Sequence, residues 1–122
     1  MPTRERVQDF VAMVEANKFV EAIREFYTED ATMQENLGDI RAGRDALVAQ
    51  EEETLRRVTS ITTRPGSTFA IDGDRVIVRW VFDIALKDGT KYSLDEIAYQ
   101  NWRGDCIGQE RFYYDPAQRT KK

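Results

Sequence analysis

The spacing of apolar residues changes near residue 60, and this change limits the possible folds more than any other feature of the chain. Before it, apolar residues recur at the i, i+3, i+4, i+7 spacing of one helix face, as in Val7, Phe10, Val11 and Val14. After Ser60, apolar and polar residues alternate with a period of two, which is typical of strands. Helices followed by a run of strands indicate an α+β domain whose sheet buries one face against the helices.

Three helices are expected before this change. Asn17 separates the first two, the first is capped by Thr3, and the third covers "RDALVAQEEETLRRV". Glu51 falls inside the apolar stripe of the third helix, and we favour a rim or exposed position for it over a buried one. A short strand is expected between the second and third helices, over residues 31–36.

The second half of the chain predicts a meander of strands. A first strand region, "SITTRPGSTFAID", is interrupted at Pro65-Gly66, where a bend, bulge or edge is expected. Turns at "DGDR", "KDGT" and "RGD" then separate the segments "VIVRWVFDIALK", "KYSLDEIAYQNW" and "CIGQERFYYD". We interpret the Arg-Gly-Asp tripeptide as a turn and not as an adhesion motif. The chain is expected to form one domain over residues 1–122, with residues 116–122 as a loose tail.

Alternation along these strands predicts which residues face the helices. The inner face is rich in aromatic residues and also carries carboxyl and amide groups: Val78, Trp80, Phe82, Ile84, Leu86, Leu94, Glu96, Ala98, Gln100, Trp102, Gly108, Glu110, Phe112 and Tyr114. The opposite face holds apolar residues among charges: Ile77, Val81, Ile97, Tyr99, Ile107 and Tyr113. That outer face is too apolar for open solvent, so we expect the chain to form a homodimer through it.

Composition excludes several classes of function. With no histidine, the chain cannot build a His-based metal site, a Ser-His-Asp triad or a Cys-His dyad, and we expect neither a metal nor a cofactor. The net charge of −4 has both signs interspersed, which argues against nucleic acid as a partner. No apolar run approaches the roughly 20 residues of a membrane span, and the charged N-terminus does not resemble a signal peptide. The lone cysteine, Cys106, cannot form an internal disulfide and fits a cytoplasmic location.

Four segments, covering most of the chain in this order, carry a resemblance to a known family: "FYTEDATMQEN", "GRDAL", "DGTKYSLDEIAYQNW" and "GDCIGQERFYYDP". They resemble the nuclear transport factor 2-like superfamily, in particular the subset that contains SnoaL-like polyketide cyclases and ketosteroid isomerase. The resemblance implies a cone-shaped, strongly curved antiparallel sheet wrapped around three N-terminal helices, with a pocket at its wide end. It does not specify a reaction, because this fold hosts isomerases, cyclases, dehydratases, hydrolases and binding modules.

The resemblance also implies where a reactive group could lie. Ketosteroid isomerase moves a proton with a carboxylate base and holds the enolate oxygen with a tyrosine and a protonated aspartate. Aligning "EDATMQE" with the segment that carries the base places Glu35 at that position. The tyrosine position falls on Phe10 or its neighbour, and the aspartate position falls on or near Ala98, one pleat from Glu96 and Gln100. SnoaL-like cyclases tend to use a histidine and an aspartate, and this chain has no histidine.

Glu35 and Glu110 are the candidate catalytic residues. Glu35 is either a general base in an apolar pocket or a rim carboxylate paired with Arg41 or Arg44. Glu110 could approach Glu35 or Glu96, and two carboxyl groups in one apolar cavity raise the pKa of one of them. The alternative for Glu110 is a buried Glu-Arg or Glu-Gln network.

The remaining candidates are expected to line a ligand pocket. Tyr27 and Tyr114 could supply hydroxyl donors or simply pack in the core, and Phe82 and Trp102 should share one cavity with Glu35. The other expected lining residues are Met33, Trp80, Glu96, Gln100 and Phe112. Two classes of function follow: a cofactor-independent proton-transfer enzyme (isomerase, cyclase or dehydratase) acting on a small hydrophobic carbonyl compound with Glu35 as base, or a non-catalytic module for ligand binding or dimerisation.

Overall fold

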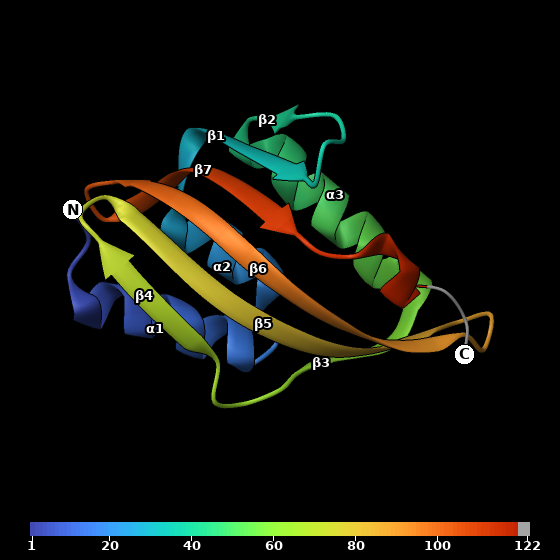
Figure 1. Cartoon of the computed structure of the whole chain (residues 1–122). Helices are drawn as coiled ribbons and strands as arrows, with labels where there is room; N and C mark the ends of the chain where they lie inside the picture. Colours follow the sequence, from blue (N-terminus) through green and yellow to red (C-terminus); the bar gives the residue numbers. More distant parts are fainter. Residues whose placement is uncertain (120–122) are drawn as a thin grey trace.

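Three helices lie against the concave face of a strongly curved sheet (Figure 1). The computed structural model describes residues 1–119. The helices are α1 (Arg4–Glu15), α2 (Phe19–Phe26) and α3 (Arg44–Arg57), as the apolar spacing predicts. The strands are β1 (Tyr27–Glu35), β2 (Arg41–Ala42), β3 (Val58–Thr63), β4 (Thr68–Asp72), β5 (Arg75–Leu86), β6 (Lys91–Arg103) and β7 (Cys106–Tyr113). The α+β class and the cone-like architecture are therefore confirmed.

The sheet is mixed and not wholly antiparallel. Its strand order is β2-β1-β7-β6-β5-β3, and β4 pairs with the other end of β5. All neighbours are antiparallel except β1 and β7, which are parallel. The strand after α2 also begins earlier than expected, because Tyr27 leaves the helix directly in an extended conformation. The first strand therefore runs beside the last, and this pairing brings residues near Glu35 next to residues near Glu110.

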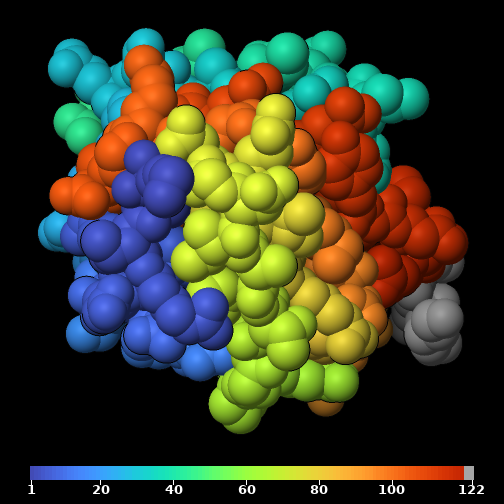
Figure 2. Space-filling model, turned by 60° about the vertical axis from the view of Figure 1, so that its left-hand side comes forward, coloured from blue at the N-terminus to red at the C-terminus, as the bar shows by residue number. Residues whose placement is uncertain are grey.

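Local sequence determines the turns that shape the sheet. Thr3 caps α1 as predicted, because its Oγ1 accepts a hydrogen bond from the backbone N–H of Arg6 at 3.1 Å. The β5–β6 turn contains Gly89 at φ +92°, a conformation that favours glycine. The predicted interruption at Pro65-Gly66 separates β3 from β4, and both then pair with β5. Figure 2 shows α1, in blue, packed directly beside the yellow-green β3–β4 region.

Two local predictions are wrong. Ile107 is fully buried on the inner face, whereas alternation placed it outside, because the pairing of β6 with β7 skips Gly108 between Gln109 and Ile107. This bulge returns Trp102 and Ile107 to the same face.

The tail is not loose over residues 116–119, which form a 3₁₀ helix, η1. Two hydrogen bonds between Gln118 and the backbone of Asp95 connect η1 to β6. Residues 120–122 lie outside the described part of the chain.

Phe10 is the centre of the aromatic core. Its ring makes edge-to-face contacts with Phe26, Tyr27, Trp80 and Trp102 at centroid distances of 5.3–6.2 Å. Such aromatic pairs stabilise the fold by more than the burial of their apolar surface alone. The ring therefore joins both N-terminal helices to the long β5–β6 hairpin. Within residues 1–119, no helix is long and apolar enough to cross a membrane.

Replacing Phe10 with alanine should destabilise the fold by about 3–5 kcal/mol, the usual cost of deleting a buried aromatic ring. The measurement is urea unfolding followed by tryptophan fluorescence, with Phe69→Ala at a half-buried ring near the surface as the control. A loss below that of the control would contradict the central position of Phe10.

Candidate active site

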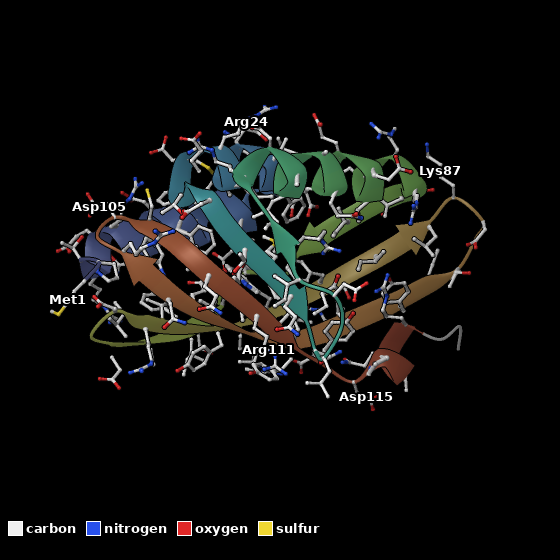
Figure 3. The ribbon with its side chains drawn as sticks, turned by 90° about the horizontal axis from the view of Figure 1, so that it is seen from above. Met1, Arg24, Lys87, Asp105, Arg111 and Asp115 are labelled. Atoms are coloured by element: carbon white, nitrogen blue, oxygen red, sulfur yellow. The ribbon has the colours of Figure 1, made fainter. Side chains whose placement is uncertain are left out.

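A cavity of about 340 Å³ lies between the helices and the concave face of the sheet. It is bounded by residues of all three helices, of η1 and of every strand except β4. Figure 3, viewed from above, shows α3 crossing over the sheet toward the β5–β6 turn at Lys87, while the β6–β7 turn at Asp105 lies at the other end. The volume falls at the small end of the range for ligand pockets in proteins.

The cavity wall combines aromatic rings with four glutamates. The apolar part includes Phe19, Met33, Trp80, Phe82, Tyr92 and Phe112. The carboxyl groups belong to Glu35 on β1, Glu51 on α3, Glu96 on β6 and Glu110 on β7. Carboxyl groups on an apolar wall lose hydration, so their protonation depends on the partners that each of them has.

Glu110 lies at the centre of a buried hydrogen-bond network. One carboxyl oxygen accepts a hydrogen bond from the Tyr27 hydroxyl and the other accepts from the Gln100 amide at 2.6 Å. The Gln100 carbonyl in turn accepts from the Trp102 indole N–H at 2.9 Å. Burial raises the pKa of Glu110 to about 7, although the hydrogen bonds from Tyr27 and Gln100 oppose the rise. Burial, together with the charge of Glu110, also raises the pKa of Tyr27 well above its usual range, so this hydroxyl stays protonated.

Glu96 is the carboxyl group of the cavity whose pKa rises furthest above its usual value. Its side chain is 7% exposed, and burial, followed by the charges of Glu110 and Glu35, raises its pKa to about 8. At neutral pH this group is mainly the neutral carboxylic acid. A neutral acid on the cavity wall can donate a hydrogen bond to an oxygen atom of a ligand.

Glu35 has a different environment from Glu96. Its Oε2 forms an ion pair with Arg41 at 3.2 Å, and its Oε1 accepts a hydrogen bond from the Tyr114 hydroxyl at 2.7 Å. Of the two arginines proposed as partners, Arg41 is therefore the one that pairs, whereas Arg44 donates to the Tyr27 carbonyl. The Glu35 side chain is 39% exposed.

The sequence did not place several residues of the cavity. Glu51, for which we favoured a rim or exposed position, lines the cavity and is half-buried, and burial raises its pKa. Arg119 lines it because η1 places the guanidinium 3.9 Å from Glu35 and 3.3 Å from the Tyr114 hydroxyl. No periodicity in a short polar tail predicts such a position. Arg57, the last residue of α3, is the third arginine of the wall.

Most of the predicted pocket residues are brought together. Residues of the cavity wall that sequence analysis named are Tyr27, Met33, Glu35, Trp80, Phe82, Glu96, Glu110 and Phe112. Gln100 and Trp102 lie behind this wall, buried in the network of Glu110, and Tyr114 reaches the cavity only through its contacts with Glu35 and Arg119. Phe82 thus shares the cavity with Glu35 as expected, whereas Trp102 faces the same side of the sheet but does not line the cavity.

A second hollow is larger but chemically less suited to a site. This open groove of about 730 Å³ is bounded by mostly polar residues of β3, β5 and β6 and by η1. Its carboxylate, Asp83, is already held by a bidentate contact with Arg64 and by the Ser93 hydroxyl, and these contacts lower its pKa to about 2. Among the described residues there is no group of three or more His, Cys, Asp or Glu side chains placed to hold a metal ion. The internal cavity is therefore the candidate site.

A curved sheet closed by three helices around an acidic, aromatic cavity defines the class of nuclear transport factor 2-like and ketosteroid isomerase-like folds. Within this class, the sequence profile of the SnoaL-like domain matches residues 7–107, and the chain belongs to that family. No curated protein matches the sequence significantly.

Solved structures support the same assignment of the fold. A protein from Mesorhizobium loti assigned as a SnoaL-like polyketide cyclase is 22% identical, with a TM-score of 0.79 over 93% of this chain and 100% of the other. A protein from Burkholderia xenovorans described as NTF2-like is 20% identical, with a TM-score of 0.75 over 93% and 89%. A protein with a ketosteroid isomerase-like fold from Catenulispora acidiphila, in complex with trimethylamine, is 19% identical, with a TM-score of 0.78 over 95% and 89%. These similarities show the fold.

The environment of Glu96 predicts a pH-dependent stability. Because its pKa is higher in the folded than in the unfolded chain, the folded state binds this proton more tightly. The resulting stabilisation is complete below the unfolded pKa of roughly 4.3 and is lost as the pH rises through about 8. Glu96→Gln, which cannot ionise, should therefore gain melting temperature relative to the unmodified protein between pH 5 and pH 8.5.

Thermal melts at several pH values in this range provide the measurement. Glu52→Gln, an exposed position on α3, is the control and should follow the unmodified protein throughout. Parallel curves for Glu96→Gln and the unmodified protein would show that the Glu96 carboxyl does not titrate in this range.

Proposed function

We propose that the protein is a cofactor-independent proton-transfer enzyme of the isomerase, cyclase or dehydratase type, acting on a small, mainly apolar carbonyl compound. The observation that carries the proposal is that one aromatic cavity holds carboxyl groups in two opposite environments. Glu35 is 39% exposed and contacts the Arg41 guanidinium and the Tyr114 hydroxyl, whereas Glu96 is buried and burial raises its pKa to about 8. A carboxylate base and a neutral acid in one cavity are the two groups that a reaction needs to remove one proton and donate to the resulting oxyanion.

Glu35 acts as the general base in this proposal. Each carboxylate oxygen has two lone pairs, so the contacts with Arg41 and Tyr114 leave each oxygen able to accept a proton. The ion pair also fixes the direction of the carboxylate at the cavity. Removal of a proton from the carbon next to the carbonyl group produces an enolate, whose negative charge lies mainly on oxygen.

Glu96 stabilises the enolate oxygen. A neutral carboxylic acid in an apolar wall is a strong donor to a developing negative charge, and it needs no reorganisation when the charge forms. Glu110 assists through electrostatics, because its charge is among the causes that keep the Glu96 proton bound. This donor lies one pleat from the position that the resemblance to ketosteroid isomerase implies.

Relatives of the same fold support a small ligand. The Catenulispora protein is in complex with trimethylamine, and the Mesorhizobium protein is assigned as a polyketide cyclase. A cavity of about 340 Å³ is consistent with a compound of one or two rings.

Deuterium exchange tests the proposal without knowledge of the natural substrate. A panel of small enolisable ketones is incubated with the protein in D₂O, and loss of the α-proton signals is followed by NMR. Glu35→Gln should abolish the catalysed exchange, because a general base contributes about 10²–10⁴-fold. Glu96→Leu should lower the rate about 10²-fold, and Glu96→Gln, which keeps a donor, should lower it less.

The control for this experiment is Glu52→Gln, which should exchange at the unmodified rate. Glu35→Gln should remain folded, since a half-exposed ion pair contributes only about 0–1 kcal/mol. Exchange that is unaffected by Glu35→Gln in a folded variant would refute the role of Glu35 as base.

A second candidate function is ligand binding without catalysis. It is favoured by the fact that both oxygens of Glu35 are already engaged, one by Arg41 and the other by Tyr114. A module of this kind would bind ketones from the panel, detected by NMR line broadening, with no exchange in D₂O above the background rate. The same experiment therefore distinguishes the two functions.

We also propose that the protein is a homodimer assembled through the outer face of the sheet, in the reducing cytoplasm that suits the lone Cys106. Ile77, Ile97 and Tyr113 on this face are 37–43% exposed. Sedimentation equilibrium at micromolar concentration should give about twice the 14.2 kDa mass of the chain. Val81→Glu, at the centre of the face, should yield a monomer that is less stable, and a monomeric unmodified protein would exclude the dimer.

A further inference from the structure

The side of α3 that faces the cavity is largely polar. A helix that covers a sheet normally presents an apolar stripe to it, and the buried Leu47 begins such a stripe in α3. The next positions on the same face are Glu51 and Thr54, at i+4 and i+7, and both line the cavity together with Gln50. Leu47 and Val48 are the buried residues of this helix. The helix that crosses over the sheet in Figure 3 therefore gives up apolar burial where it meets the cavity.

Three oxygen-bearing side chains of the cavity wall have no hydrogen-bond partner within residues 1–119. They are Glu51 and Thr54 on α3 and Glu96 on the facing sheet. Their oxygen atoms remain accessible, because the fully buried polar atoms that lack a partner belong to Arg41 and Ser67. Glu96 is only 7% exposed and lines the cavity, so a molecule in the cavity can reach its carboxyl group.

Glu51 interacts with the other carboxyl groups of the cavity. Burial raises its pKa, and the charge of Glu35 adds to this rise. Glu51 in turn contributes to the raised pKa of Glu96, after burial and the charges of Glu110 and Glu35. It thus acts on both groups that the proposed reaction uses, from the helix that faces them. A compound held between Glu35 and Glu96 therefore has Glu51 as a neighbour.

We propose that Glu51 and Thr54 form a subsite for a hydroxyl group, and that the substrate is a small hydroxy ketone whose ketone lies toward Glu96. The inference rests on the proposed function, because it takes this cavity as the substrate site. A hydroxyl group both donates and accepts, and the two side chains offer the complementary pair: the Glu51 carboxyl accepts in either protonation state, and the Thr54 hydroxyl can donate. An ammonium group can only donate, and an alkyl group leaves both side chains without a partner.

Matched ketones test this subsite by affinity alone. The probes are acetophenones with a hydroxymethyl, ethyl or aminomethyl substituent, each as the meta and the para isomer, titrated into the protein at pH 7 by calorimetry or NMR. The three substituents are similar in size and differ in hydrogen bonding and charge. We expect one hydroxymethyl isomer to bind at least about tenfold more tightly than its ethyl counterpart, because a site built for a hydroxyl group is left with unpaired groups when the hydroxyl is missing. The aminomethyl compounds should bind more weakly than that isomer.

Variants connect the preference to α3. Glu51→Leu should remove it, since the acceptor is lost and the new apolar neighbour favours the ethyl group. Glu51→Gln keeps an acceptor and should retain part of the preference, and Thr54→Val, which keeps the shape, should lower it by a smaller factor. Glu52→Leu, at the exposed neighbouring position, is the matched control and should bind as the unmodified protein does. Glu51→Leu completes the apolar stripe, so its melting temperature should not fall.

Glu96→Leu tests the orientation of the ligand. The ketone is common to all probes, so this variant should weaken binding of the hydroxymethyl and ethyl compounds alike and leave the ratio of their affinities unchanged. A ratio that falls to about one would place the hydroxyl group at Glu96 and overturn the subsite on α3.

Deuterium exchange of the same ketones separates this inference from the proposed function. A hydroxyl preference that depends on Glu51, without catalysed exchange, would support the subsite and refute catalysis. Catalysed exchange without a hydroxyl preference would support catalysis and refute the subsite. Tighter binding of the aminomethyl compounds, binding of none of the probes, or a preference that persists in folded Glu51→Leu would also overturn the subsite.

Discussion

The carboxyl group of Glu110 is the buried polar group on which the arrangement of the cavity depends. It is 2% exposed and lies on the concave face, where an unpaired charge would be costly. Its partners come from two other strands: Tyr27 at the start of β1 and Gln100 on β6, whose side-chain carbonyl accepts in turn from Trp102, also on β6. Loss of any of these donors would leave a buried oxygen unsatisfied. The network therefore fixes the register of β1, β7 and β6 relative to each other.

This fixed register has an electrostatic consequence for the rest of the cavity. Glu110 is 2% exposed and both of its oxygens accept hydrogen bonds from buried side chains, so it is less accessible to a ligand than the 39% exposed Glu35. Its charge acts instead on its neighbour Glu96, which has the higher pKa. Glu35 lies two residues beyond Met33, the β1 residue that pairs with Glu110, and it contacts Arg41 and Arg119. Glu35 is also among the charges that raise the pKa of Glu96, so β1, β6 and β7 bring three interacting carboxyl groups to one cavity.

Much of the fold could be predicted from the sequence, because each element has a strong local signal. The i, i+3, i+4 spacing predicts α1 to α3, and the Gly and Pro positions predict the turns between strands. Ile107 was misplaced because a bulge at Gly108 shifts the alternation, and a Cβ there would meet the Arg103 guanidinium at 2.5 Å. Nothing in a two-residue alternation signals such a shift in advance.

The candidate site could be predicted only where it depends on which face of the sheet a strand residue occupies. Glu96, Glu110 and the aromatic wall follow from which face each strand turns inward, and a resemblance to relatives points to Glu35. Arg41 was one of the two predicted partners of Glu35, but Arg57 and Arg119 do not follow, because their positions depend on tertiary contacts. Gln118 pairs with the backbone of Asp95 at the edge of β6, and this contact holds η1 where the next residue, Arg119, reaches Glu35 and Tyr114. The balance between carboxylates and guanidiniums in the cavity therefore depends on a side-chain clamp in a segment whose composition alone suggests no structure.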